Sequence, residues 1–313
     1  MKQYLGIDIG GTAVKLGIVD ELGNVLFTHT QGVAFDQYNT PIIKTVKRSI
    51  HEFFNLYQIS SKDLEGIGVS ATGQIDHQSG IVIGVGGNIK NWCGTDIKRE
   101  LEQAFHLKTT VVNDANCMIM GEKWLGRGKG YRNIIGITIG TGVGGGIIIG
   151  NQLLHGTRGI AGEIGHFSID HKGELCTCGN VGCYEQYASM TALVKKVKEN
   201  EQELNLSVTG DEINGEVIFK ALAAGNKKIQ KLVEEWVTSI SKGLISLVHL
   251  FNPQLILIGG GVCTQEEYFI KPIRSYVLNH VMNQFSKDLE IAAATLGNQA
   301  GLVGAIYYHL QQE

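Results

Sequence analysis

One histidine and three cysteines in the middle of the chain are spaced as metal ligands. Cys176, Cys178 and Cys183 lie close together, and His166 precedes them in the same segment. Three thiolates and one imidazole complete the tetrahedral shell of a structural zinc site and leave no position open for a catalytic water. The spacing therefore predicts one structural Zn²⁺, with three unligated buried thiols as the alternative.

Two glutamates lie on either side of this cluster, Glu163 before His166 and Glu185 after Cys183. Coordination through one ring nitrogen would orient His166 and direct its other N–H elsewhere. Two carboxylates and an imidazole held rigidly in this way match the hydroxyl groups of a polyhydroxylated ligand. Taken singly, either glutamate could equally be a solvated surface residue.

Three glycine-rich segments follow apolar runs, at Asp8–Thr12, Gly140–Gly146 and Gly259–Val262. Glycine lets backbone N–H groups approach an anion closely, and a carboxylate such as Asp8 can hold a hydrated Mg²⁺ beside substrate phosphates. The simpler explanations are a hairpin turn, close packing of strands and a strand-to-helix turn. Two glycine turns that lack the lysine and hydroxyl of a P-loop favour a nucleotide held from two lobes. The predicted ATP-binding residues are Asp8, Gly10, Gly11, Thr12, Lys15, Thr141, Gly142, Gly144, Gly260 and Gly261.

Asn113 and Asp114 come directly after an apolar strand and before a helix. Reacting groups in α/β proteins lie at such strand ends, and a carboxylate there can take the proton from an attacking hydroxyl. Asp114 is therefore predicted to be a general base. The competing interpretation is a helix N-cap, and the two roles are compatible only if the cap leaves a carboxylate oxygen available.

The composition is that of a soluble, folded protein. Of 313 residues, 42 are glycine and 3 are proline, hydrophobic residues make up 43%, and the formal net charge is −3. Such a chain can bury a large core, and it shows no collagen, coiled-coil or disordered pattern. The apolar runs are too short for a membrane span, and neither a signal peptide nor a basic block for nucleic acid is recognisable. A cytoplasmic protein with small-molecule ligands is expected, with neither nucleic acid nor membrane as a partner.

The order of the predicted elements indicates two α/β lobes. Each half of the chain begins with a strand, a glycine turn and a second strand, around Asp8–Thr12 and again around Gly140–Gly146. This repeated pattern predicts two lobes, each of which contributes a glycine turn to a shared cleft. The first lobe is expected to comprise residues 1–115 with about 299–313, and the second lobe residues 116–298. Helices are predicted over 41–57, 95–105, 185–200 and 227–251, and from about 299 to the end.

With these motifs together, the sequence resembles the ROK family (repressors, open reading frames and kinases), sugar kinases of the actin-like ATPase superfamily. The resemblance covers essentially the whole chain and rests on the glycine segments, the Asn113-Asp114 pair, and the histidine and cysteine cluster with its two glutamates. It implies two RNase-H-like lobes around a central cleft, which binds ATP with Mg²⁺ and a hexose, and it implies a homodimer. It also implies that Asp114 is the catalytic base and that zinc is held by His166 and the three cysteines. The residues implied to contact sugar hydroxyls are Asn113, Asp114, Glu163, His166 and Glu185.

Two loops depart from the pattern of many glucokinases in this family. Those enzymes have Pro-Gly-Pro-Val-Asp where this chain has Ala-Thr-Gly-Gln-Ile-Asp at 71–76, and Pro-Asn-Leu where Gly-Asn-Ile stands at 87–89. Both loops contact the sugar in relatives, which adds Gly73, Gln74 and Asn88 to the predicted sugar-binding residues. The small residues look more like those of N-acetylmannosamine kinases and would leave space for an acetamido group. The expected activity is ATP-dependent phosphorylation of the 6-hydroxyl of a hexose or N-acylhexosamine, with N-acetylmannosamine preferred and a glucokinase or β-glucoside kinase as alternatives.

A different class of function is a sugar sensor that keeps the fold without turnover. The intact Asp114 and both phosphate segments favour the enzyme. The repressor branch of the family carries a DNA-binding helix-turn-helix before the kinase-like part. Here the first strand begins near residue 4, so no room for such a segment is expected.

Overall fold

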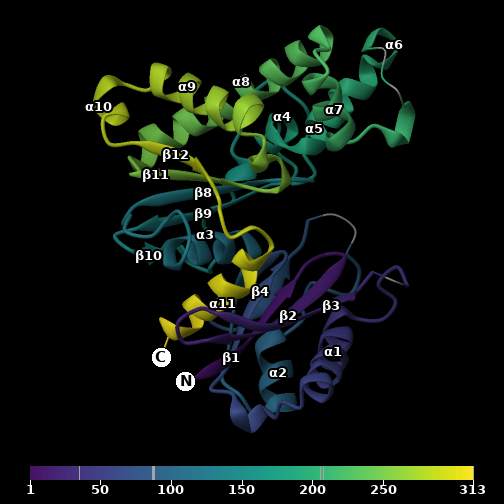
Figure 1. The fold of residues 1–313 in the computed structure, drawn as a ribbon, viewed down its shortest axis with the longest axis vertical. Helices are drawn as coiled ribbons and strands as arrows, with labels where there is room; N and C mark the ends of the chain where they lie inside the picture. Colours follow the sequence, from purple (N-terminus) through teal and green to yellow (C-terminus); the bar gives the residue numbers. More distant parts are fainter. Residues whose placement is uncertain (35, 87–88, 205, 207, 313) are drawn as a thin grey trace. The chain divides into compact units, whose positions relative to one another are not determined.

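The computed structural model describes residues 1–34, 36–86, 89–204, 206 and 208–312, which form two compact units (Figure 1). The first unit comprises Met1–Arg132, Gly146–Gly162 and Thr295–Glu313, and the second comprises Asn133–Gly145 and Glu163–Ala294. Within the described part of the chain, no helix is both long enough and apolar enough to cross a membrane.

The first unit is built on a five-stranded mixed sheet with the strand order β3-β2-β1-β4-β7. β1, β4 and β7 run parallel, β2 pairs antiparallel with β1, and the edge strand β3 pairs antiparallel with β2. A fully buried run such as β4 is typical of a strand that is covered on both faces. The strands are β1 Gln3–Ile9, β2 Ala13–Asp20, β3 Val25–Gly32, β4 Ile67–Ala71 and β7 Thr109–Asn113, with a separate ribbon of β5 Gln74–Asp76 and β6 Ile81–Gly84.

Helices cover both faces of this sheet, and successive residues of β1 point to opposite faces. Leu5 and Ile7 belong to the apolar core that includes residues of α1 and α2. On the other face, a Cβ on Gly6 would lie 3.4 Å from Leu302 of α11, and the carboxylate of Asp8 lies next to Gly301 of the same helix. The helices are α1 Ile42–Tyr57, α2 Ile97–Phe105, α3 Asp114–Trp124 and α11 Ala300–Leu310, with the 3₁₀ turns η1 Ser61–Asp63 and η6 Gly297–Gln299.

Helices α3 and α11 approach each other closely through two glycines. A Cβ on Gly304 would lie 1.7 Å from the carbonyl oxygen of Cys117, and one on Gly121 would lie 2.6 Å from the carbonyl oxygen of Ala300. A side chain at either position would overlap the backbone of the facing helix. Because α3 packs on α11, it belongs to the first unit, and the predicted boundary near residue 115 falls inside that unit.

A second five-stranded mixed sheet has the order β10-β9-β8-β11-β12, in which β8, β11 and β12 are parallel. Its strands are β8 Ile134–Ile139, β9 Val143–Ile149, β10 Gln152–Leu153, β11 Leu255–Gly259 and β12 Glu290–Ala293. The helices of the second unit are α4 Glu185–Ala188, α5 Met190–Glu199, α6 Glu201–Leu204, α7 Gly215–Ala223, α8 Lys227–Phe251, α9 Lys271–His280 and α10 Asn283–Ser286. Shorter turns are η2 Ile164–His166, η3 Gly210–Glu212, η4 Gly261–Thr264 and η5 Glu266–Ile270. The two mixed sheets and their helices confirm the predicted α/β class.

Two predicted helices differ from those observed because of their caps. The helix expected from Thr95 begins two residues later, because the side chain of Asp96 accepts a hydrogen bond from Arg99 N at 3.0 Å. The helix expected over 185–200 is divided at Ser189, which has an extended backbone and caps α5 through its hydroxyl. The predicted helix over 227–251 is confirmed.

The contact between α3 and α11 predicts a large effect of Gly304→Ala. The added methyl group would force the helices apart, so we expect the free energy of unfolding to fall by about 3 kcal/mol or more. Chemical denaturation monitored by circular dichroism measures it. Gly32→Ala is the control, because a Cβ there would meet only the Thr12 carbonyl oxygen, at 3.9 Å. Equal denaturation midpoints for the two variants would contradict the close contact.

Candidate functional site

Three parallel strands of the first unit end together at one edge of the sheet. The register pairs Asp8 with Ser70 and Ala71 with Asn113, so the carboxyl ends of β1, β4 and β7 are level. Such an edge is where α/β proteins gather reacting groups. The structure therefore brings Asp8, Asn113 and Asp114 together, although the sequence analysis identified them in separate motifs.

The carboxylate of Asp8 is held from two sides. Ser70 Oγ donates to Asp8 Oδ1 at 2.7 Å, and a Cβ on Gly301 would lie within 2.7–2.8 Å of the carboxylate atoms. Burial raises the pKa of Asp8, although the hydrogen bond from Ser70 and the charge of Lys15 act to lower it. Lys15 Nζ donates to the carbonyl oxygen of Asn298 at 2.6 Å. A buried carboxylate of raised pKa would be stabilised by a bound cation.

Asn113 and Asp114 have different roles at the start of α3. Asn113 is the N-cap, and its Oδ1 accepts from the backbone N–H groups of Ala115 and Asn116 at 2.9 and 3.3 Å. Asn113 Nδ2 donates to the carbonyl oxygen of Gly73 at 2.9 Å and to Asp114 Oδ1 at 3.0 Å. The second hydrogen bond to Asp114, from Ala115 N at 2.8 Å, also reaches Oδ1. The interpretation of Asp114 as the N-cap is therefore wrong, and its two hydrogen bonds share one carboxylate oxygen.

The pKa of Asp114 lies well above the ordinary value for an aspartate. Burial and the nearby charge of Asp8 raise it to about 6, against the opposing effect of hydrogen bonds from Ala115 and Asn113. A carboxylate with this pKa is ionised at neutral pH and still basic enough to accept a proton from a reacting hydroxyl. Asp114 has the electrostatic properties of a general base.

The loop after β4, predicted to contact sugar, is fixed by its backbone. Gly73 has φ of +100°, a conformation that favours glycine, and Gln74 begins β5. Trp92 Nε1 donates to the carbonyl oxygen of Thr72 at 2.9 Å, and the indole is fully buried. Asn88, the other residue predicted in these loops, lies outside the described residues.

The first glycine turn connects β1 to β2. Gly10 N donates to the carbonyl oxygen of Ala13 at 2.9 Å, and Val33 N donates to that of Thr12 at 2.9 Å. The side chain of Thr12 is exposed. This geometry is that of a hairpin turn beside Asp8, and it is also compatible with an approaching phosphate.

The glycine turn of the second unit is shorter than the predicted segment. Gly140–Gly142 connect β8 to β9, whereas Gly144 lies within β9. Gly260 has φ of +100°, and a Cβ there would lie 2.0 Å from the carbonyl oxygen of Ile139, so the turn after β11 packs against the end of β8. The structure therefore places the two glycine turns side by side. Their exposed residues include Thr141, Gly260 and Gly261.

Glu185 lies against the first of these turns. Its Oε2 accepts from Val143 N at 2.8 Å, and a Cβ on Gly142 would lie 2.3 Å from the same oxygen. A residue predicted to bind sugar is thus next to a residue predicted to bind the nucleotide.

The four metal ligands predicted from their spacing in the sequence lie together in the structure. The ligand atoms of His166, Cys176, Cys178 and Cys183 all lie within 4.8 Å of one another. His166 Nδ1 is 3.7 Å from Cys176 Sγ, and the sulfurs of Cys178 and Cys183 are 3.5 Å apart. A tetrahedral Zn²⁺ with Zn–S bonds near 2.3 Å separates its ligand atoms by about 3.7 Å. The geometry and the chemistry of the four donors fit such an ion.

His166 and Glu163 are joined by a 3₁₀ turn. His166 N donates to the carbonyl oxygen of Glu163 at 3.0 Å, and the side chain of Glu163 is exposed. Since Nδ1 of His166 faces the cysteines, Nε2 is the ring nitrogen that remains for another partner.

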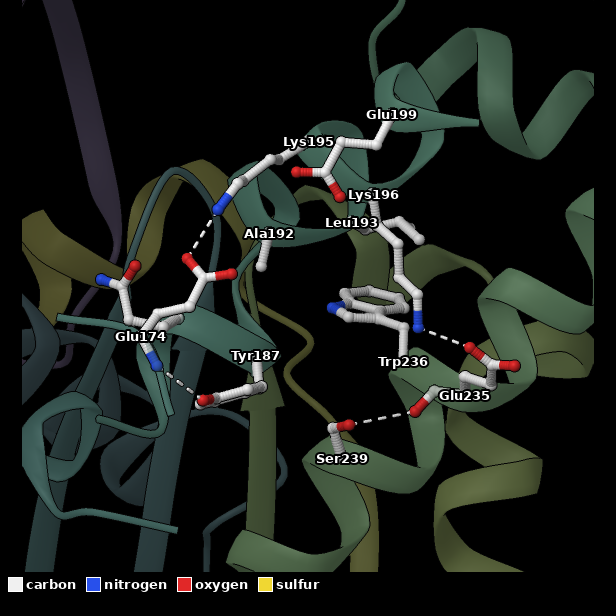
Figure 2. A pocket seen from close by; sticks show the side chains of 11 residues that line it. Glu174, Tyr187, Ala192, Leu193, Lys195, Lys196, Glu199, Glu235, Trp236 and Ser239 are labelled. Atoms are coloured by element: carbon white, nitrogen blue, oxygen red, sulfur yellow. Dashed lines mark hydrogen bonds and ion pairs between the residues drawn. The ribbon is translucent and has the colours of Figure 1, made fainter. Parts of the chain in front are cut away.

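A pocket on the second unit is lined by residues that the sequence analysis did not single out (Figure 2). Lys195 pairs with Glu174 at 2.5 Å, and Lys196 pairs with Glu235, so the charge of each lysine is balanced. Trp236, which also lines the pocket, is only 3% exposed. The predicted catalytic, sugar-binding and metal-binding residues all lie elsewhere, and we assign no ligand to this pocket.

Several residues that position the site are not among those predicted from the sequence. Ser70 had a recognisable signal, because it is a polar side chain inside the apolar strand Ile67–Ala71. Gly301 and Trp92 had none, because their roles depend on contacts with Asp8 and Thr72, which are distant in sequence.

Comparison with known proteins identifies the family. The sequence profile of the ROK family matches residues 4–312. The chain belongs to the ROK family. It is 36% identical to a glucokinase of Streptomyces coelicolor, over 97% of this chain and 96% of that protein. It is 34% identical to a β-glucoside kinase of Listeria monocytogenes, over 99% and 98%.

Two solved structures are similar over nearly their whole length. A ROK glucokinase of Streptomyces griseus, in complex with glucose and AMPPNP, is 35% identical with a TM-score of 0.82, and 97% of each chain is covered. A proposed N-acetylmannosamine kinase of Listeria monocytogenes is 31% identical with a TM-score of 0.83, and 99% of each chain is covered. The predicted family, its fold and the enzyme class of hexose kinase are confirmed.

Proposed function

We propose that this ROK protein transfers the γ-phosphoryl group of ATP to the 6-hydroxyl of glucose or of a β-glucoside. The observation that supports this most directly is the state of Asp114. It lies at the end of β7, its pKa is raised to about 6, and both of its hydrogen bonds reach Oδ1. We therefore assign Oδ2 as the oxygen that accepts the hydrogen bond, and then the proton, of the substrate hydroxyl.

In the proposed reaction, Asp114 takes the proton of the 6-hydroxyl while the oxygen attacks the γ-phosphorus. The new bond joins the sugar oxygen to phosphorus, the bond to the β-phosphate oxygen breaks, and ADP leaves. Most of the acceleration of phosphoryl transfer comes from positioning and electrostatics. The proposal assigns this work to backbone N–H groups of the glycine turns at Gly10–Thr12 and Gly140–Gly142 and to the hydroxyl groups of Thr12 and Thr141.

A metal ion is part of the proposal. The buried carboxylate of Asp8 fits Mg²⁺, which binds a few carboxylates together with substrate phosphates. When bound, Mg²⁺ supplies positive charge opposite the phosphates. Ser70 and Gly301 would keep Asp8 in place for this role.

Each unit, taken by itself, contains candidate residues for contacts with sugar hydroxyl groups. In the first unit these are Asn113 and the loop with Gly73 and Gln74. In the second unit, Glu163 and Glu185 accept from hydroxyl groups, and Nε2 of His166 is available because its other ring nitrogen faces the metal cluster. The homodimer implied by the family resemblance stays a prediction.

N-acetylmannosamine is the second candidate substrate. The small residues of the Ala71–Gln74 loop and the similar Listeria structure support it. The glucokinase and β-glucoside kinase relatives, one of them with glucose in its crystal, give more support to glucose. The sequence-based preference for N-acetylmannosamine is therefore the weaker of the two proposals.

Kinetics on a panel of sugars test the function. We expect kcat/KM with ATP to be at least about tenfold higher for glucose or a β-glucoside than for N-acetylmannosamine, since a site built for one set of polar groups discriminates against another. A coupled assay of ADP release measures it. A preference for N-acetylmannosamine would show that the 71–74 loop decides specificity, and no turnover with any sugar would favour a sensor.

Asp114→Asn should reduce kcat by about 10²–10⁴-fold, because the general base is lost, while the affinity for sugar stays within a few-fold. The base works only when ionised, and burial places its pKa near 6, so wild-type kcat/KM should fall tenfold per pH unit below about pH 6. The control is Asp96→Asn, which keeps the N-cap of α2 and should retain full turnover. Normal kcat in Asp114→Asn would place the base elsewhere.

One Zn²⁺ per chain is expected in the histidine and cysteine cluster. Cys178→Ser should lower both the zinc content and the melting temperature, because structural zinc contributes directly to folding free energy. Elemental analysis and thermal unfolding measure the two effects. Cys93→Ser is the control, since Cys93 is also exposed but lies outside the cluster. Protein purified without chelators and free of zinc would contradict the assignment.

A further inference from the structure

Tyr38, in the segment between β3 and α1, connects two loops of the first unit. Its hydroxyl donates to the carbonyl oxygen of Gly11 at 2.6 Å, in the turn proposed to bind phosphate. Its own carbonyl oxygen accepts from Asn91 Nδ2 at 3.1 Å, in the loop between β6 and α2. One residue therefore holds the phosphate turn with its side chain and the neighbouring sugar loop with its backbone.

The backbone around these contacts is held in an unfavourable conformation. Tyr38 has φ of +61°, Gln37 has +56° and Asn91 has +57°. A bulky residue such as tyrosine rarely adopts the left-handed region, and such residues persist where surrounding contacts over-determine them, often at functional sites. Ile89, from the same loop as Asn91, also lies close to the turn, since a Cβ on Gly11 would lie 3.3 Å from Ile89 Cδ1.

The hydrogen bonds continue from Asn91 to the proposed catalytic base. Its neighbour Trp92 donates from Nε1 to the carbonyl oxygen of Thr72 at 2.9 Å. The carbonyl oxygen of the next residue, Gly73, accepts from Asn113 Nδ2, which also donates to Asp114 Oδ1. A continuous series of contacts thus runs from the phosphate turn, through Asn91 and Trp92 and the predicted sugar loop at 71–74, to Asp114.

We propose that Tyr38 is a positioning residue that couples sugar binding to the orientation of the phosphate turn. This inference rests on the proposed kinase function and concerns the same site. A sugar that contacts the 71–74 loop, or the loop that carries Asn91 and Trp92, stabilises the arrangement in which Tyr38 binds Gly11. The turn is then already oriented when the nucleotide arrives, so each ligand lowers the free-energy cost of binding the other.

The test measures binding of the preferred sugar of the panel by calorimetry, with and without saturating AMPPNP and Mg²⁺. In the wild type we expect the nucleotide to lower the Kd of the sugar by about fivefold or more, the lower end of ordinary coupling between sites. In Tyr38→Phe, which loses only the hydroxyl, the ratio of the two Kd values should fall to about two or less. Asn91→Asp, which loses the Nδ2 donor but can adopt the left-handed conformation, should reduce the ratio in the same way.

Tyr57→Phe is the matched control. Tyr57 packs against the same apolar core, and its hydroxyl also donates to a backbone carbonyl oxygen, that of Thr28 at 3.3 Å. Its contact involves neither loop, so the wild-type ratio should be retained.

The outcomes separate this inference from the kinase function. A wild-type ratio near one, or an unchanged ratio in Tyr38→Phe, overturns the role of Tyr38 even if the protein phosphorylates sugar. If Tyr38→Phe weakens sugar binding equally with and without AMPPNP, the ratio of the two Kd values is unchanged. Tyr38 would then be a structural residue only, and this result also overturns the proposed coupling. If the wild type binds sugar and nucleotide without turnover, the kinase assignment fails, while a ratio lost in Tyr38→Phe still supports the coupling. Absence of binding to every sugar of the panel overturns both.

Discussion

The packing of α3 against α11 is the constraint on which the proposed active site of this ROK protein depends. Asp114 begins α3, and Gly301 in the first turn of α11 touches the carboxylate of Asp8. Because Gly121 and Gly304 let the two helices approach to backbone contact, the positions of both aspartates follow from one interface. A looser interface would leave Asp8 without its support and Asp114 without its neighbouring charge.

The same interface creates an electrostatic cost. Two carboxylates lie close enough that the charge of Asp8 contributes to the raised pKa of Asp114, and burial raises the pKa of both. A folded protein gains nothing in stability from such a pair, because each ionised form is disfavoured by burial and by the other charge. Such an arrangement suits the proposed reaction, which needs a base and a cation-binding carboxylate at the same place.

The histidine and cysteine cluster fixes the shape of a long loop in the second unit. The long loop between β10 and α4 contains little regular structure, and four ligands close in sequence give it a fixed shape. His166 and Glu185 lie at the two ends of the cluster, and Glu185 reaches the glycine turn through Val143. A metal ion bound at this cluster would therefore fix the positions of residues of the second unit that are assigned to the sugar.

The sequence by itself determined the features that depend on short separations. The metal ligands could be predicted because their spacing is local, and the long helix over 227–251 could be predicted because its periodicity and its breaking proline are local. Asp114 could be recognised because a strand and a helix adjoin it directly. Only the tertiary structure decided which groups support these residues. Ser70 and Gly301 meet Asp8 through strand register and helix packing, and Trp92 and Tyr38 reach Thr72 and Gly11 across loops distant in sequence. The raised pKa of Asp114 belongs to the same class, because burial and the distance between two charges exist only once the strands and helices are packed.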